Sequence, residues 1–125
     1  MSYKLAFLQQ TENLITELIN ILPGNYNVEL FKEKFFLIKK INSNLIVNSF
    51  IKYILPHKDH IVNHNDKFFL DGGGQEAVTE DNYQFALDIK NDWKTITDDN
   101  KEIIYKYFNI LVLISEKVIL ENLKS

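Results

Sequence analysis

The fold is decided by residues 98–123, which read DDNKEIIYKYFNILVLISEKVILENL. Apolar side chains recur here every three or four positions, the spacing that places them on one side of an α-helix. The main apolar stripe consists of Ile103, Ile104, Tyr107, Ile110, Leu111, Ile114 and Val118. Thr97 is suited to cap this helix, and Asp98 and Asp99 favour its positive N-terminal end. At ~1.5 Å per residue the helix would be about 39 Å long, enough to cross a small domain.

This helix is more apolar than a peripheral helix needs to be. Phe108, Val112 and Ile119 widen the stripe to about half of the circumference. Leu113 and Leu120 lie seven residues apart on the otherwise polar side. Two interpretations follow. The helix is either central to a bundle, or it is shared with a second chain through an interface of Leu113, Leu120, Phe108 and Val112.

Most of the remaining chain also has helical patterning, at about 3–22, 28–41, 44–55, 56–64 and 81–94. Ser2 and Asn27 are suited to cap the first two of these helices. Pro23-Gly24 ends the first, and Pro56 suits the first turn of a short fourth helix. In residues 28–41 the expected buried stripe is Phe31, Phe35 and Ile38.

Residues 71–80 contain three consecutive glycines, Gly72 to Gly74, and predict a mobile loop because glycine carries high backbone entropy and no side chain to pack. No sustained apolar–polar alternation predicts a strand. We therefore expect a single domain over residues 1–125, folded as an all-α, compact bundle of about six helices with a long C-terminal helix.

Composition argues against several classes of function. The chain has 125 residues, no cysteine and a net charge of -3, so it lacks a thiolate zinc site, a cysteine nucleophile and the overall basic excess of a duplex-binding module. All fourteen basic residues are lysine, so bidentate arginine contacts with phosphate or guanine are missing. The longest apolar run, Ile110 to Ile114, is far short of the roughly 20 residues that span a bilayer. We expect a soluble, cytoplasmic protein with no membrane association.

The three histidines, His57, His60 and His64, all lie within one short stretch. On a helix, offsets of three and four residues place side chains on one face, where imidazoles can converge on a divalent metal. No H-E-x-x-H pattern accompanies them. Three alternatives stay open at this stage: a metal site, a pH-responsive patch, or solvated surface histidines.

Catalytic and cofactor signatures are missing from the sequence. The predicted loop at residues 71–80 is acidic but lacks the alternating ligands of an EF-hand. Its glycines are not followed by the Gly-Lys-Ser/Thr of a phosphate-binding loop. Ser49 and Ser115 lie inside predicted helices without the glycine-flanked elbow of a serine nucleophile. We therefore expect a protein that is not an enzyme and that needs no cofactor.

Sixteen aromatic residues raise the alternative of single-stranded nucleic-acid binding, which uses exposed aromatics interleaved with basic side chains. Lys52-Tyr53 and Lys67-Phe68-Phe69 could form such a patch. Most other aromatics fall on predicted core faces, and the composition does not favour a nucleic-acid partner.

Two segments carry a family resemblance. The first is Leu55-Pro56-His57-Lys58-Asp59-His60-Ile61 running to Phe68-Phe69-Leu70. The second is Trp93, Asn100-Lys101, Tyr105-Lys106-Tyr107, and Leu111 to Lys117. Together, over roughly residues 50–118, they resemble small, mostly uncharacterised helical proteins of nucleocytoplasmic large DNA viruses. The resemblance implies no chemistry, but it implies a setting: host cytoplasm, viral factory or virion.

These observations favour a non-enzymatic helical protein that interacts with other proteins, either as a homo-oligomer or with a different protein partner, and that serves as a viral accessory or virion component. The alternatives are a metal-binding or pH-responsive module built on the histidines, and single-stranded nucleic-acid binding.

Overall fold

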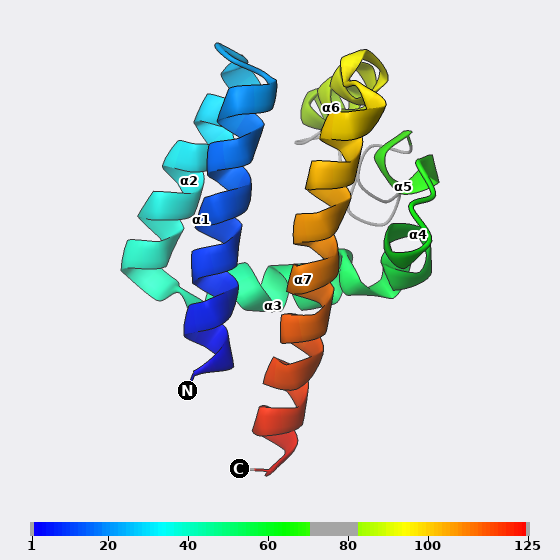
Figure 1. The fold of residues 1–125 in the computed structure, drawn as a ribbon. Coiled ribbons are helices and arrows are strands. Elements are labelled where there is room, and N and C mark those ends of the chain that lie inside the picture. The colour runs from blue at the N-terminus through cyan, green and yellow to red at the C-terminus, as the bar shows by residue number, and fades with distance from the viewer. Residues whose placement is uncertain (1, 71–82, 125) are drawn as a thin grey trace.

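A computed structural model describes residues 2–70 and 83–124, with side chains in the second range described from residue 87 onward (Figure 1). Within these ranges every regular element is helical and no strand occurs. The expected all-α fold with a long C-terminal helix is confirmed. The loop predicted at residues 71–80 lies outside the described residues.

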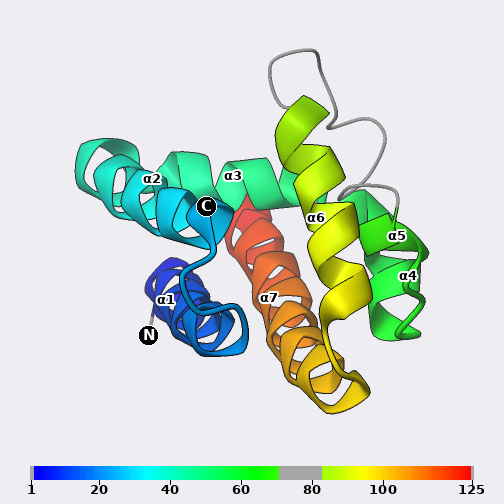
Figure 2. The same cartoon turned by 90° about the horizontal axis from the view of Figure 1, so that it is seen from above.

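The elements are, in chain order, α1 (Tyr3–Ile21), α2 (Tyr26–Asn42), α3 (Asn44–Tyr53), the 3-10 turn η1 (Leu55–His57), α4 (Lys58–Val62), α5 (Lys67–Leu70), α6 (Tyr83–Thr95) and α7 (Asp98–Lys124). Helix α7 runs between two groups of helices. Helix α1 packs along it in the opposite direction, and α2 lies outside α1 (Figures 1 and 2). Helices α4, α5 and α6 lie on its other side, and α3 crosses behind it.

The core surrounds α7, which confirms the interpretation of a central helix. Five of its apolar residues are buried: Ile104, Tyr105, Leu111, Val112 and Val118. They pack with buried residues from most of the other elements, among them Phe7, Leu14, Val47, Phe50, Ile61, Phe68, Phe69 and Trp93. A smaller cluster of Leu8, Ile15 and Phe35 joins α1 to α2. Because the apolar residues of α7 point in several directions, the helix can pack against neighbouring helices on several sides at once.

The helix caps agree with the sequence at α1 and differ at α2. Ser2 Oγ accepts a hydrogen bond from the Leu5 amide at 3.2 Å, as expected for a capping serine. Helix α2 begins two residues earlier than predicted, because Asn25 rather than Asn27 is its cap and accepts from the Val28 amide at 3.1 Å. Gly24, with φ 73°, makes the left-handed turn that precedes this cap.

The region around Pro56 departs most from the prediction. The single helix expected at 56–64 is divided into η1 and α4. A further short helix, α5, forms at residues that the sequence pattern left ambiguous. Its Phe68 and Phe69 are 4% and 6% exposed. Their packing against α6 and α7 decides this local structure, since a one-turn helix has no stability of its own.

Candidate interaction surface

One side of α7 stays uncovered by the rest of the described chain. Leu113 and Leu120 are 61% and 56% exposed, and the helical repeat places them on one face, two turns apart. Glu116 and Lys117 lie between them in sequence and on the same side. We call Leu113, Glu116, Lys117 and Leu120 the α7 exposed stripe. It is bounded by α4 on one side and by the start of α1 on the other.

The two charged residues of the α7 exposed stripe also tie the helix to its neighbours. Lys58 Nζ of α4 donates to Glu116 Oε2 at 2.9 Å, and the hydrogen bond and charge of Glu116 raise the pKa of Lys58 above its ordinary value. Lys117 Nζ lies 5.4 Å from the centre of the Tyr3 ring in a cation–π arrangement. Leu113 and Leu120 are therefore presented on a helix whose flanking charges are held in place.

Two of the four predicted interface residues do not belong to this surface. Val112 is 1% exposed and lies in the core of its own chain, so it cannot contact a partner. Phe108 is half-buried, and its ring lies 5.3 Å from that of Phe69 and 6.4 Å from that of Phe68. The sequence could not reveal that Phe68 and Phe69 cover Phe108, because α5 was not predicted.

A second exposed apolar surface lies on α2. Phe36, Leu37 and Ile41 are 44%, 58% and 75% exposed. A shallow hollow in this surface is lined by Phe36, Leu37, Lys39 and Lys40. The predicted buried stripe of α2 is correct only in part, since Phe35 is 4% exposed but Phe31 is 38% exposed. The four consecutive apolar residues at 35–38 were the available signal, because a helix cannot turn all of them inward.

The most elaborate polar cluster joins the turn before α5 to α6 and α7. Tyr105 Oη donates to Asp66 Oδ1 at 2.6 Å, and Lys101 Nζ lies 3.5 Å from Asp66 Oδ2 and 5.1 Å from the Trp93 ring. Burial opposes ionisation of Asp66, but the Tyr105 hydroxyl and the Lys101 ammonium hold its pKa below the ordinary value. Burial, together with the bond to Asp66, raises the pKa of Tyr105 above its usual range. Asp66, Lys101 and Tyr105 each have a partner inside the protein, so we assign the cluster to folding.

The predicted histidine cluster does not form a three-ligand site. The rings of His57 and His60 are 6.5 Å apart, whereas His64 lies beyond the end of α4 and stacks on the Tyr105 ring at 4.5 Å. His64 Nδ1 is 3.1 Å from the Glu102 carboxylate, and Nε2 is 3.4 Å from Asn109 Nδ2. Among the described residues no group of three or more histidine, aspartate or glutamate side chains is arranged to hold a metal ion.

His64 owes its position to the way α4 ends. Its backbone φ is 53°, in the left-handed region that favours glycine. The His64 amide donates to the Ile61 carbonyl at 3.1 Å, and the Asn65 amide donates to the His60 carbonyl at 2.8 Å. These two bonds are the Schellman pattern of a helix C-terminus, in which glycine is usual at the position of His64. This left-handed turn directs the imidazole toward α7 instead of along the face of α4.

The aromatic patch considered for single-stranded nucleic acid is not a surface. Phe68 and Phe69 are core residues, and Phe69 stacks on Trp93 with ring centres 3.9 Å apart. Lys52 does lie over the ring of Tyr53, which is 39% exposed. One exposed aromatic ring beside one lysine is not the series of stacking side chains that such binding uses.

The predicted helical serines have ordinary structural surroundings. Ser115 is fully buried, and its hydroxyl donates to the Val112 carbonyl at 2.8 Å. Ser49 is exposed on α3.

Comparison with known proteins found no family model, no curated protein and no solved structure that matches this chain. Within the described ranges, no helix combines the length and apolar character needed to cross a membrane.

Proposed function

We propose that this chain is a non-enzymatic protein–protein interaction domain that self-associates through the α7 exposed stripe. The observation that supports this proposal is the arrangement of Leu113, Glu116, Lys117 and Leu120. Two exposed leucines enclose an acidic and a basic residue, so the stripe is complementary to a copy of itself.

The complementarity follows from two-fold symmetry. In a symmetric dimer the same patch serves both partners, so each contact occurs twice. If two α7 helices lie antiparallel with the axis between residues 116 and 117, Leu113 of one copy faces Leu120 of the other. The same register places Glu116 opposite Lys117 of the second copy. Apolar side chains thus meet apolar ones, and opposite charges meet beside them.

The size of the stripe implies a weak dimer. Complete burial of a leucine side chain contributes roughly 1.5–3 kcal/mol, so covering the exposed parts of four leucines contributes about 4–7 kcal/mol. Association costs at least about 4 kcal/mol in lost translational and rotational freedom. The balance of at most about 3 kcal/mol predicts a monomer–dimer equilibrium with a dissociation constant of several millimolar or weaker.

Sedimentation velocity at protein concentrations up to several millimolar tests the proposal. We expect Leu113→Glu and Leu120→Glu to abolish the dimer, because each places a carboxylate in the apolar contact. Leu37→Glu is the matched control, since it makes the same change at a similarly exposed leucine on α2. A wild-type protein that stays monomeric at the highest soluble concentration would contradict the proposal.

Charge reversal tests the two-fold register itself. Glu116→Lys and Lys117→Glu should each weaken the dimer by placing like charges opposite one another. The double variant should recover affinity, because it restores an opposite pair in the antiparallel arrangement. Failure of the double variant to recover, with circular dichroism unchanged, would reject this register.

The setting of this activity rests on the resemblance of residues 50–118 alone. It supports a role as an accessory or virion component of a large DNA virus, acting in the host cytoplasm or viral factory. Detection of the protein by mass spectrometry in purified virions, or in infected-cell cytoplasm only, would separate the two roles.

A further inference from the structure

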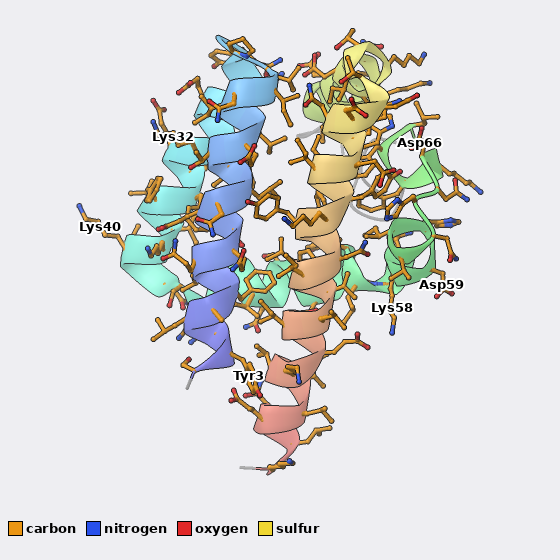
Figure 3. All side chains as sticks on the ribbon, in the orientation of Figure 1. Tyr3, Lys32, Lys40, Lys58, Asp59 and Asp66 are labelled. Atoms are coloured by element: carbon orange, nitrogen blue, oxygen red, sulfur yellow. The ribbon has the colours of Figure 1, made fainter. Side chains whose placement is uncertain are left out.

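The outward side of α2 combines apolar and basic side chains. Glu33, Lys34, Leu37, Lys40 and Ile41 are exposed and lie three or four residues apart along the helix. Phe36 is 44% exposed and adjoins Lys40 one turn further on. We call these six residues the α2 outer face. Figure 3 shows Lys32 and Lys40 extending from α2 away from the body of the protein.

The inward side of the helix is fully engaged, which separates its role from that of the outer face. Phe35 is buried with Leu8 and Ile15 of α1. Lys39 forms an ion pair with Glu12 of α1 and lies 5.9 Å from the centre of the Phe36 ring. These contacts fix the orientation of α2, so the outer face is held rigidly toward solvent.

The charge of this surface is opposite to that of the whole chain. Residues 32–41 contain four lysines and one glutamate, whereas the chain carries a net charge of -3. Within the described residues, Lys34 and Lys40 form no ion pair, in contrast to Lys39. A local excess of unpaired positive charge beside exposed leucine and isoleucine side chains is complementary to a surface that is both acidic and apolar.

A second copy of α2 is a poor occupant. In a symmetric pairing through Leu37, the lysines that flank this residue on both sides would face lysines of the other copy. Like charges placed across an interface oppose association. The α2 outer face therefore differs from the α7 exposed stripe, where the charges are balanced and suit self-pairing.

A lipid or nucleic-acid surface fits less well than a protein. Both present one sign of charge, and Glu33 at the N-terminal end of the patch would face their phosphates. Membrane binding by a surface helix scales with the apolar area that it buries, and here only three large apolar side chains project. Lysine also lacks the bidentate geometry with which arginine holds phosphate.

We propose that the α2 outer face docks an acidic amphipathic helix of a protein partner. The partner's apolar side chains, spaced three and four residues apart, lie along Phe36, Leu37 and Ile41. Its flanking carboxylates face Lys34 and Lys40. This contact is independent of the proposed α7 dimer, because the two surfaces lie on different helices and share no residue.

The experiment uses the full chain and two synthetic helical peptides. Both peptides carry leucines at positions i, i+3, i+4 and i+7; one has glutamate at the flanking positions and the other has lysine. Fluorescence anisotropy measures binding of each labelled peptide at low and at physiological salt. We expect the glutamate peptide to bind at least about tenfold more tightly, with affinity that falls as salt rises.

Variants of the chain assign the binding to this surface. Leu37→Glu should abolish binding of the glutamate peptide, and the double change Lys34→Glu with Lys40→Glu should reduce it by about tenfold or more. Lys90→Glu repeats the charge change at an exposed lysine on α6 and should have no more than a small effect. Leu113→Glu is the matched apolar control, and it should not alter peptide binding.

Three results would overturn the proposal. One is equal affinity for the two peptides or no binding of either, and another is binding that survives both the Leu37→Glu change and the double lysine change. The third is binding of phosphatidylserine vesicles or of an oligothymidine strand that depends on Lys34 and Lys40 and is tighter than binding of the glutamate peptide. Circular dichroism of each variant establishes that a loss of binding is not a loss of folding.

Discussion

Replacing His64 with glycine and, separately, with alanine should distinguish backbone strain from side-chain packing at the end of α4. His64 occupies the left-handed position of a Schellman motif with φ 53°. This conformation costs roughly 1–2 kcal/mol for a residue with a Cβ atom, whereas glycine adopts it without that cost. In return, the imidazole stacks on Tyr105 with ring centres 4.5 Å apart and planes nearly parallel.

The two replacements remove different contributions to stability. An aromatic stack contributes about 0.5–1.5 kcal/mol beyond burial, and the solvent-exposed contact with Glu102 adds no more than about 1 kcal/mol. Alanine keeps the strain and loses the stack, so we expect a loss of about 1–2 kcal/mol. Glycine loses the stack but also the strain, so its stability should stay within about 1 kcal/mol of the wild type.

Thermal unfolding followed by far-ultraviolet circular dichroism measures the difference. In a domain of this size 1 kcal/mol corresponds to roughly 3–5 °C, so the glycine variant should melt several degrees above the alanine variant. His64→Asn should fall between them, because asparagine tolerates the left-handed region but cannot stack. An alanine variant as stable as the glycine variant would refute the reasoning, since helix propensity and the lost stack alone predict no advantage for glycine.

Three further predictions concern stability. Val112→Ala should lower the free energy of unfolding by about 2 kcal/mol, because it leaves a cavity in the core. Leu113→Ala should change the free energy of unfolding by no more than about 0.5 kcal/mol. Equal losses for the two variants in denaturant titrations would contradict the burial of Val112. The pKa of Asp66 is lowered on folding, so its contribution to stability is present above its ordinary pKa of 3.8 and is lost as the pH falls below that value. Urea titrations should therefore show a shallower acid loss in Asp66→Asn than in the wild type, and an identical slope would argue against the shift. Asn25→Ala removes the cap of α2 and should cost about 1 kcal/mol in the same assay, and no measurable loss would contradict the capping role.

The long helices could be predicted from the sequence because their signals are local and repeated. Helix α7 has an apolar repeat over more than six turns, and α1 has a capping serine and a Pro-Gly stop, so the observed bounds differ from the expected ones by one residue at each altered end. The cap of α2 was misplaced because Asn25 and Asn27 are chemically equivalent candidates. Both side chains donate to an aspartate of α6, Asn25 to Asp92 at 3.0 Å and Asn27 to Asp88 at 2.7 Å. The Asn25 oxygen is the one that accepts from the Val28 amide in the first turn of α2.

The candidate surfaces were harder to predict because exposure depends on which neighbour covers a residue. Phe108 and Val112 have the same apolar character as Leu113, but Val112 is buried in the core and Phe108 is half covered by Phe68 and Phe69 of α5. Helix α5 itself was out of reach, since a four-residue helix exists only through the packing of Phe68 and Phe69. The α2 outer face could not be predicted from the expected stripe of Phe31, Phe35 and Ile38, because that stripe does not indicate where Phe36, Leu37 and Ile41 lie.

The packing of α1 against α7 has a consequence for biosynthesis. Helix α1 is synthesised well before α7, its main partner, and the contact of Tyr3 with Lys117 joins residues far apart in the sequence. Until α7 emerges, the apolar face of α1 lacks its main partner, and Phe7 has only neighbours such as Phe50 of α3 to pack against. The α1–α7 packing therefore forms only once α7 has been synthesised, and until then the nascent chain exposes aggregation-prone surface that chaperones can bind. A prematurely terminated chain without α7 would remain at that stage.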